Sequence, residues 1–231
     1  MESASGTPFL AQDLPSSSCM VEWEIPIIGD SRFRRSPGTT KSSCSIVGAT
    51  AAARATAKRL MATDVLSLMD ALHVTKAALV GWSDGAIIGL DIAIHHPDRL
   101  TRLFAFAANS DTSGVKDVDK DPVFNAYFSR TKEEYKKLSP TPTELKVFSE
   151  QLDKMWDSEP HFSDDQLRSI KVPTWIVDGD RDEVIKRENT DHMAALIPAA
   201  GELILPEVSH FALLQDPGQF NDALLHSLSR P

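Results

Sequence analysis

The sequence predicts an α/β protein built on a doubly wound, mainly parallel sheet. From about residue 51 onward, short apolar segments alternate with longer segments that have helical periodicity. The short segments are continuously apolar rather than alternating, which is typical of parallel strands covered by helices on both faces. The chain has 231 residues, of which 42% are hydrophobic, so it is long enough to bury the core of one such domain.

The predicted elements follow one another along the chain. The segments with strand character are 77–80, 103–108, 173–178 and 202–205. The segments with helical character are 51–73, 84–95, 187–197 and 218–228. The first helix is amphipathic, with Leu60, Leu68 and Leu72 at helical spacing. Pro97 and Asp98 form a stop signal for the second helix.

A change of pattern interrupts this alternation. Between residues 109 and 170 the sequence contains two polar helical stretches, 124–138 and 143–156, separated by Ser139-Pro140-Thr141-Pro142. Strand and helix alternate again after this segment. We therefore interpret residues 110–170, approximately, as a small helical cap inserted into a single domain that comprises residues 1–231.

The most informative motif is Gly-x-Ser-x-Gly at Gly81-Trp82-Ser83-Asp84-Gly85. It follows the apolar strand directly and runs into an apolar helix, which is the context of a nucleophile elbow. In such an elbow a serine lies at the tip of a strained turn, and the two glycines remove Cβ atoms that would meet neighbouring backbone. Ser83 is therefore the candidate nucleophile.

Asp182 is the candidate acid of a catalytic triad. It follows the predicted strand 173–178, at the sheet edge where open α/β sheets collect functional groups. A carboxylate at this position would orient a histidine and stabilise its charged form. Asp178, at the strand end, and Asp180, in the turn, remain open alternatives.

His210 is the candidate general base and acid. It lies directly after the strand 202–205, and it completes the chain order nucleophile, acid, histidine that this kind of sheet requires. An imidazole with a pKa near neutrality suits the proton transfers of such a site. His95 and His96 precede Pro97 at a helix end and are interpreted as helix-capping residues. The remaining histidines, without such a context, are His73, His161, His192 and His226.

Other ligand classes have no signature in the sequence. There is no His-x-x-x-His or Cys-x-x-Cys spacing for a metal, and no glycine-rich loop typical of a nucleotide or dinucleotide. A net charge of −9 disfavours nucleic acid and anionic membrane surfaces as partners. We expect no metal, no cofactor, no nucleic acid and no membrane, and a small molecule as the partner.

The chain is expected to be cytoplasmic. Its first residues include no basic region followed by a long apolar stretch, and no apolar run approaches the length of a membrane span. Cys19 and Cys44 are expected to be free thiols, because one pair makes no disulfide framework in a protein of this kind.

From about Leu60 to the C-terminus, the motifs resemble the α/β-hydrolase superfamily, in the branch of small esterases, enol-lactone hydrolases and similar cofactor-free enzymes. The segments that carry the resemblance are 64–72, 81–85, 172–182 and 208–211. The resemblance implies an α/β-hydrolase fold, a triad of Ser83, Asp182 and His210, and an oxyanion-stabilising backbone N–H at Asp84. Trp82, beside the serine, is assigned with Asp84 to substrate binding. The other aromatic candidates for an apolar pocket, Trp156, Phe104, Phe106 and Phe211, are also explained by core packing.

Residues 1–58 depart from the pattern of the family. Family members have a strand ending in His-Gly, whose loop supplies a second oxyanion donor, and then an Asp-x-Arg-Gly-x-Gly turn. Neither motif occurs here, and the alanine-rich run 49–56 stands where the Arg-Gly turn is expected. We hypothesise that residues 9–58, approximately, arise from a gene-model or splicing error or from a decayed segment.

The function expected from this resemblance is hydrolysis of a small carboxylic ester or lactone through an acyl-enzyme. A C–C bond hydrolase or a cofactor-free haloperoxidase on the same fold would use the same triad. A non-catalytic binding protein is a further alternative, since the second oxyanion donor is missing. A structural or interaction module has the least support, because it does not explain Gly81 and Gly85.

Overall fold

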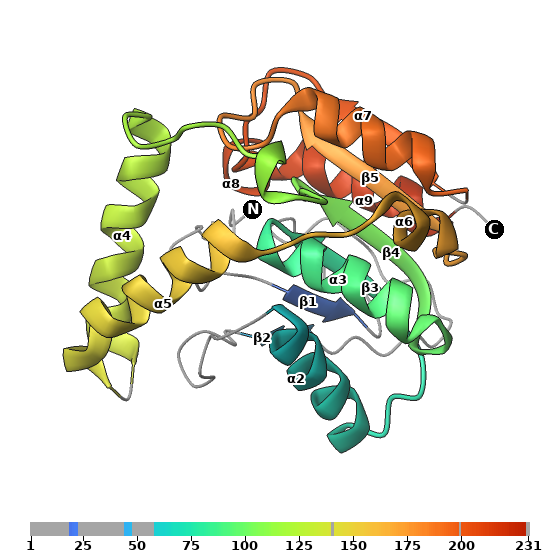
Figure 1. Cartoon of the computed structure of the whole chain (residues 1–231), viewed down its shortest axis with the longest axis horizontal. Helices are drawn as coiled ribbons and strands as arrows, with labels where there is room; N and C mark the ends of the chain where they lie inside the picture. The colour runs from blue at the N-terminus through green and yellow to red at the C-terminus, as the bar shows by residue number, and fades with distance from the viewer. Residues whose placement is uncertain (1–18, 23–43, 48–57, 140, 199, 230–231) are drawn as a thin grey trace, which may run out of the picture.

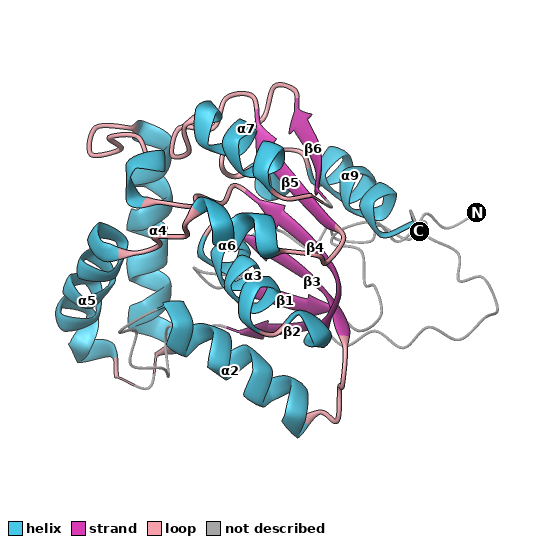
Figure 2. Ribbon diagram, turned by 45° about the vertical axis from the view of Figure 1, so that its right-hand side comes forward, coloured by secondary structure: helices cyan, strands magenta, loops and turns pink. Residues whose placement is uncertain are grey.

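The computed structural model describes residues 19–22, 44–47, 58–139, 141–198 and 200–229. These residues form a six-stranded sheet in the order β2-β1-β3-β4-β5-β6, with helices on both faces (Figures 1 and 2). The strands are β1 (Cys19–Glu22), β2 (Cys44–Val47), β3 (Ala77–Trp82), β4 (Leu100–Phe106), β5 (Thr174–Gly179) and β6 (Ala200–Leu205). The α-helices are α2 (Lys58–Ala71), α3 (Asp84–His95), α4 (Pro122–Leu138), α5 (Leu145–Ser158), α6 (Asp164–Ser169), α7 (Arg187–Leu196), α8 (Ala212–Gln215) and α9 (Pro217–Ser229). Short 3₁₀ helices cover Pro97–Arg99, Thr112–Gly114 and Pro142–Glu144.

The predicted α/β class is confirmed. Strands β3 to β6 are parallel neighbours, and each is joined to the next by a segment that contains at least one helix. Because their carboxyl ends lie at one edge of the sheet, the loops after β3, β5 and β6 meet there. This edge therefore brings together segments that are far apart in the sequence.

Two short strands that the sequence did not predict extend the sheet beyond β3. Strand β1 is antiparallel to both β2 and β3. Of the segment 9–58 that departs from the family pattern, only these strands and Lys58 are among the described residues, and the rest lies outside them. In the β1–β2 ladder Cys19 pairs with Val47 and Cys44 with Glu22. The two cysteine positions are thus offset by three residues in this ladder.

The alternation of side chains along the strands divides the core into two layers. On one face, Leu79 and Leu103 pack with the apolar sides of α2, α3, α6 and α7. On the other, Phe104 and Phe106 pack against Phe220 of α9, with ring centroids 5.7 and 5.3 Å apart. Both faces of the central strands are buried, which is why their sequences are continuously apolar.

The insertion between β4 and β5 contains the predicted cap helices. Helices α4 and α5 project from one end of the sheet and contact each other, whereas α6 packs beside α3 and α7 (Figures 1 and 2). No residue of α4 is fully buried, and in α5 only Met155 is. The apolar sides of both helices are therefore left to line a cavity rather than to fill the core.

Several boundaries differ from those predicted. Strand β4 spans residues 100–106 rather than 103–108, because Leu100 is buried and pairs with Ala77 of β3. Strand β3 continues through Gly81 and Trp82 to the edge of the elbow. The first helix is described from Lys58, and the predicted residues before it lie outside the described part.

Among the residues that the structure describes, no helix combines the length and the apolar character needed to cross a membrane.

Candidate active site

The turn between β3 and α3 has the backbone strain expected of a nucleophile elbow. Ser83, the residue before the first turn of α3, has φ 53° and ψ −120°. Residues other than glycine rarely adopt this backbone conformation. The surrounding backbone maintains this conformation. The Ser83 N–H donates to the Phe106 carbonyl at 2.9 Å, and its carbonyl accepts from Ala86 N–H at 2.9 Å. The structure thus places the serine at a strained tip between strand and helix.

Gly81 is required by the close approach of α3 to β3. A Cβ atom at this position would lie 2.4 Å from the carbonyl oxygen of Gly85 and 2.5 Å from the backbone nitrogen of Ala86. Both atoms belong to the backbone, so no side-chain rotation relieves the overlap. The turn can therefore form in this geometry only with glycine at position 81.

We expect Gly81→Ala to lower the free energy of unfolding by about 3 kcal/mol, because the new methyl group must displace the start of α3. Urea unfolding monitored by circular dichroism measures this effect. Gly218→Ala is the matched control: its Cβ would meet only the Asp216 side chain, at 3.3 Å, and alanine is favoured in a helix. Equal stability of the Gly81 and Gly218 variants would contradict the steric argument.

Asp182 and His210 form a buried pair at the same edge of the sheet. Oδ2 of Asp182 lies 2.8 Å from Nδ1 of His210, and the two side chains are only 2% and 4% exposed. The other carboxylate oxygen, Oδ1, accepts the N–H groups of Val184 and Ile185, each at 2.6 Å. The carboxylate is therefore held in one orientation from both sides.

The charge state of Asp182 follows from these contacts. Burial acts to raise the pKa of this carboxyl, but the charge and hydrogen bond of His210, together with the Ile185 N–H, lower the pKa below its ordinary value. Asp182 is thus ionised near neutral pH. An ionised carboxylate on Nδ1 is the arrangement that stabilises an imidazolium.

The contacts distinguish Asp182 from its two alternatives. Asp180 is exposed in the turn. Asp178 is buried, but its carboxylate oxygens accept from Gly179 N–H at 2.9 Å and from the Thr190 hydroxyl at 2.8 Å. No hydrogen bond from either side chain to His210 is found among the described residues, and Asp182 is the acid of this group that contacts the imidazole.

Two residues hold the loop that carries His210. The indole Nε1 of Trp82 donates to the His210 carbonyl at 2.8 Å, and the Trp82 ring packs edge-on against Phe211 and Tyr127. The carboxylate of Glu183 accepts the His210 N–H at 3.2 Å. Glu183 was not identified from the sequence, because its partner is 27 residues away and no local pattern indicates it.

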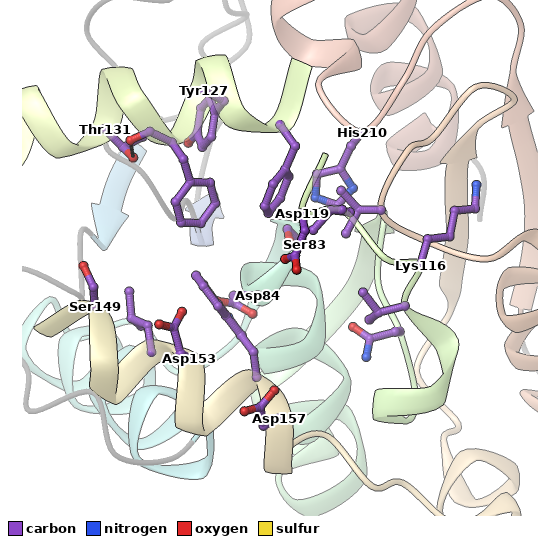
Figure 3. Close-up of a pocket in the computed structure, with 18 of the residues that line it drawn as sticks. Ser83, Asp84, Lys116, Asp119, Tyr127, Thr131, Ser149, Asp153, Asp157 and His210 are labelled. Carbon is purple, nitrogen blue, oxygen red and sulfur yellow. Dashed lines mark hydrogen bonds between the residues drawn. The ribbon is translucent and has the colours of Figure 1, made fainter. Parts of the chain in front are cut away.

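Ser83 and His210 both line one cavity of about 720 Å³ beneath the cap (Figure 3). Trp82 and Asp84 line the same cavity, so all the predicted site residues except the buried Asp182 reach it. The cavity lies between α4 and α5 on one side and the elbow on the other (Figure 3). Its aromatic lining consists of Trp82, Phe124, Tyr127, Phe128, Tyr135, Phe148, Trp156 and Phe211. Of the aromatic residues proposed from the sequence, Phe104 and Phe106 are core residues instead.

Asp84 connects the elbow to the cap. Its backbone nitrogen belongs to the first residue of α3, and its side chain, 8% exposed, accepts the indole N–H of Trp156 at 2.9 Å. Trp156 lies on α5 and also packs edge-on against Phe128 of α4. The position next to Ser83 is thus fixed by a contact with α5.

The described residues include no group of three or more His, Cys, Asp or Glu side chains arranged to hold a metal ion. Nδ1 of His95 donates to the carbonyl oxygen of Asp91, at 2.9 Å, within its own helix, where His95 is the last residue.

Comparisons with known proteins find relatives and structural neighbours that are named as hydrolases. No model of a protein family matches the chain. Over 173 residues the chain is 25% identical to the serine hydrolase BPHL of Homo sapiens, in a match that covers 69% of this chain and 57% of that protein. The chain thus spans a little over half the length of this relative.

Two solved structures have the same fold. The meta-cleavage product hydrolase of Pseudomonas fluorescens IP01 superimposes with a TM-score of 0.60 and 17% identity, over 74% of this chain and 71% of that one. The enol-lactonase of Burkholderia xenovorans LB400 gives a TM-score of 0.56 and 19% identity, over 76% and 74% of the two chains. At these identities the likeness shows the fold alone.

Proposed function

We propose that this chain is a serine hydrolase of the α/β-hydrolase superfamily, and that it cleaves a small carboxylic ester or lactone through an acyl-enzyme on Ser83. One observation carries the proposal: His210, which is paired with the buried Asp182, lines the same cavity as a serine held in a strained elbow. Backbone strain and a buried charged pair both cost folding free energy. Together they supply a nucleophile, a base and a group that orients the base, as an activated nucleophile requires.

The chemistry assigned to these residues is nucleophilic acyl transfer. Since Nδ1 of His210 is bound by Asp182, Nε2 is the ring nitrogen that removes the proton from the Ser83 hydroxyl. The serine oxygen attacks the carbonyl carbon, and the backbone N–H of Asp84 stabilises the oxyanion. His210 then returns the proton to the leaving alcohol. A water molecule, activated by the same imidazole, releases the acid and restores Ser83.

The cavity supports a small, partly apolar substrate. Its walls from α4 and α5 combine aromatic rings with polar side chains, among them Asp153 and Asp157, and Lys116 is a further exposed polar residue at the same cavity (Figure 3). A cavity in which aromatic side chains supply apolar area and polar groups fix the orientation of the ligand is typical of small-molecule binding. The name of the enol-lactonase shows that the fold is compatible with a lactone.

A second candidate is C–C bond hydrolysis by the same triad, which the name of the structurally similar meta-cleavage product hydrolase favours. A cofactor-free haloperoxidase would also use these residues. Turnover of a panel of esters, lactones and vinylogous diketones, together with a halogenation assay that supplies peroxide and halide, separates the three activities, and we expect the ester or lactone to be turned over fastest.

Labelling with a fluorophosphonate tests the proposal without knowledge of the substrate. Attack by Ser83 forms a bond to phosphorus and expels fluoride, while His210 accepts the serine proton. We expect a stable adduct located on Ser83 by mass spectrometry of the digested protein. A folded sample that gives no adduct on Ser83 would instead support the non-catalytic binding protein, in which the scaffold holds a ligand without turnover.

The second oxyanion donor bears on the expected rate. The segment that supplies it in the family falls within residues 1–58, most of which lie outside the described residues. Loss of one donor costs about 2.7–4 kcal/mol of transition-state stabilisation, a factor of about 100 or more in rate. Ser83 could therefore react readily with the fluorophosphonate while the protein hydrolyses esters slowly. Such a result would not contradict the assignment of Ser83.

A further inference from the structure

The cavity next to Ser83 follows both cap helices for most of their length. On α4 its lining residues lie one, three or four positions apart, at Phe124, Tyr127, Phe128, Thr131, Lys132 and Tyr135. On α5 the lining residues have the same spacing, from Leu145 to Asp157. Residues at this spacing lie on one face of a helix. One face of α4 and one face of α5 therefore form a continuous groove, which we call the cap groove (Figure 3).

Ring contacts between the two helices define the ends of the cap groove. At the near end, Trp156 of α5 donates to the Asp84 carboxylate at 2.9 Å and packs edge-on against Phe128 of α4. At the far end, the Tyr135 ring of α4 stacks on the Phe148 ring of α5, with the ring centroids 5.0 Å apart. Since the two rings on each helix are seven or eight positions apart, a rise of about 1.5 Å per residue places the far end roughly 10–12 Å from the near end. The acyl transfer described above uses only the near end.

The far part of the cap groove offers apolar surface to a ligand. Tyr135, Phe148 and Leu152 line the cavity and are each only partly buried. Covering this remaining apolar surface is favourable, because it removes the surface from water. The charged residues Lys132 and Asp153 line the same stretch but are exposed, so they keep their hydration and need no partner in the ligand. The far part is therefore suited to an apolar group.

The size of the cavity exceeds what hydrolysis of a short ester requires. Its volume of about 720 Å³ lies within the range of about 300–1,000 Å³ that is typical of sites for drug-sized molecules. An acetyl ester with its carbonyl at Ser83 occupies only the near end of the cap groove. The far end is in contact with a substrate only if that substrate extends along both helices.

We propose that the cap groove is a subsite for a linear apolar arm of the substrate, joined to the ester or lactone group that Ser83 attacks. The proposal rests on the proposed function, because the attack by Ser83 places the carbonyl at the near end. With carbon–carbon bonds of about 1.5 Å, an extended arm of about eight carbon atoms reaches the stacked rings of Tyr135 and Phe148. The arm takes no part in the bond changes. It contributes binding, and so selects esters and lactones with an alkyl arm over acetyl esters.

Pairs of esters that differ only in the length of the arm test this selection. Methyl butyrate and methyl octanoate carry the arm on the acyl side, and butyl acetate and octyl acetate carry it on the alcohol side. Burial of one methylene group favours binding by a factor of about four, so four methylene groups that are half covered give about 10-fold or more. In one of the two pairs we expect kcat/KM to be higher by this factor for the eight-carbon ester. A ratio near one in both pairs would overturn the proposal.

Thr131→Phe tests whether the selection arises in the cap groove, because it adds a ring between the near and far ends on α4. We expect the ratio of kcat/KM between the eight-carbon and four-carbon esters to fall to within about threefold of one. Ser129→Phe is the matched control. Ser129 is exposed on the same helix, and its hydroxyl, like that of Thr131, donates to the backbone of that helix. The control should keep the wild-type ratio, and equal ratios in the two variants would contradict the assignment of the arm to the groove.

Binding of the same esters to the Ser83→Ala variant tests the groove without turnover. Calorimetric titration gives the dissociation constant of each ester. In the pair whose arm enters the groove, we expect the eight-carbon ester to bind about 10-fold more tightly than the four-carbon ester. Adding Thr131→Phe to this variant should remove the difference. Affinities that do not depend on the length of the arm in either pair would exclude the subsite.

The outcomes distinguish this inference from the proposed function. A chain that binds the eight-carbon ester more tightly but hydrolyses none of the esters would contradict the proposed function and support the subsite. A chain that hydrolyses and binds short and long esters equally well would contradict the subsite alone. If Thr131→Phe does not fold, Ser149→Phe on the facing helix α5 places a ring in the same groove and takes its place in both experiments (Figure 3).

Discussion

Replacing Ser83 with alanine is expected to lower ester hydrolysis by about 10⁴-fold or more and to abolish fluorophosphonate labelling, because the alanine has no oxygen to form the acyl-enzyme. The fold should be retained, since alanine is no bulkier than serine and the hydrogen bonds at this position are made by backbone atoms. Hydrolysis of a chromogenic acetate ester under saturating conditions measures the effect.

Ser149 provides the matched control for this variant. It lies on α5 and lines the same cavity, but it is on the cap and not at the elbow (Figure 3). Ser149→Ala should keep both the labelling and most of the hydrolysis. Equal losses in the two variants would mean that the cavity, and not Ser83, determines the reactivity.

Asp182→Asn is expected to lower hydrolysis by about 10⁴-fold with little change in substrate binding. An asparagine can still accept the Val184 and Ile185 N–H groups through its carbonyl oxygen, but the amide nitrogen then faces Nδ1 of His210. Because an amide nitrogen only donates, the imidazole must carry its proton on Nε2. That tautomer cannot remove a proton from Ser83.

The control for this variant is Asp180→Asn, two residues earlier in an exposed position. Both changes remove one negative charge from the same loop, so only the contact with His210 differs. We expect the Asp180 variant to retain the activity of the wild type. A large loss there, or full activity in Asp182→Asn, would contradict the assignment of the acid.

The elbow and the chain order of the site were predictable because they depend on local sequence and on a general property of parallel sheets. Gly81 and Ser83 lie two residues apart in one local motif. The motif indicates both the close approach of the backbone at Gly81 and the strained conformation of Ser83. Asp182 and His210 are 28 residues apart, but each follows a recognisable strand. Since the carboxyl ends of parallel strands meet at one edge, their proximity followed from the strands alone.

The contacts that support these residues could not be predicted from the sequence. The Trp82–His210 hydrogen bond joins positions 128 residues apart, and the Trp156–Asp84 bond joins positions 72 residues apart. The periodicity of the sequence does not specify which hydrogen-bond acceptor each tryptophan indole contacts. That choice depends on how the loops and the cap helices pack in three dimensions.

The antiparallel strands β1 and β2 show a different limit. Each has four residues, too few for an apolar alternation to stand out from chance. The pairing of β1 with β3 joins strands more than 50 positions apart along the chain, and β2 is attached to the sheet only through β1. The sequence pattern that normally marks this region of the fold is also missing, so neither local signal nor resemblance indicated these strands.

The hydrogen bond between the Trp156 indole and the Asp84 carboxylate gives the protein an intrinsic optical reporter of cap position. Tryptophan emission depends on the polarity and charge around the indole, and this indole sits between the elbow and the ring of Phe128. Movement of α5 away from the sheet would separate Trp156 from the carboxylate and expose it to water. Because the chain has four tryptophans, a variant that keeps Trp156 as its sole tryptophan would make the emission a direct measure of this contact.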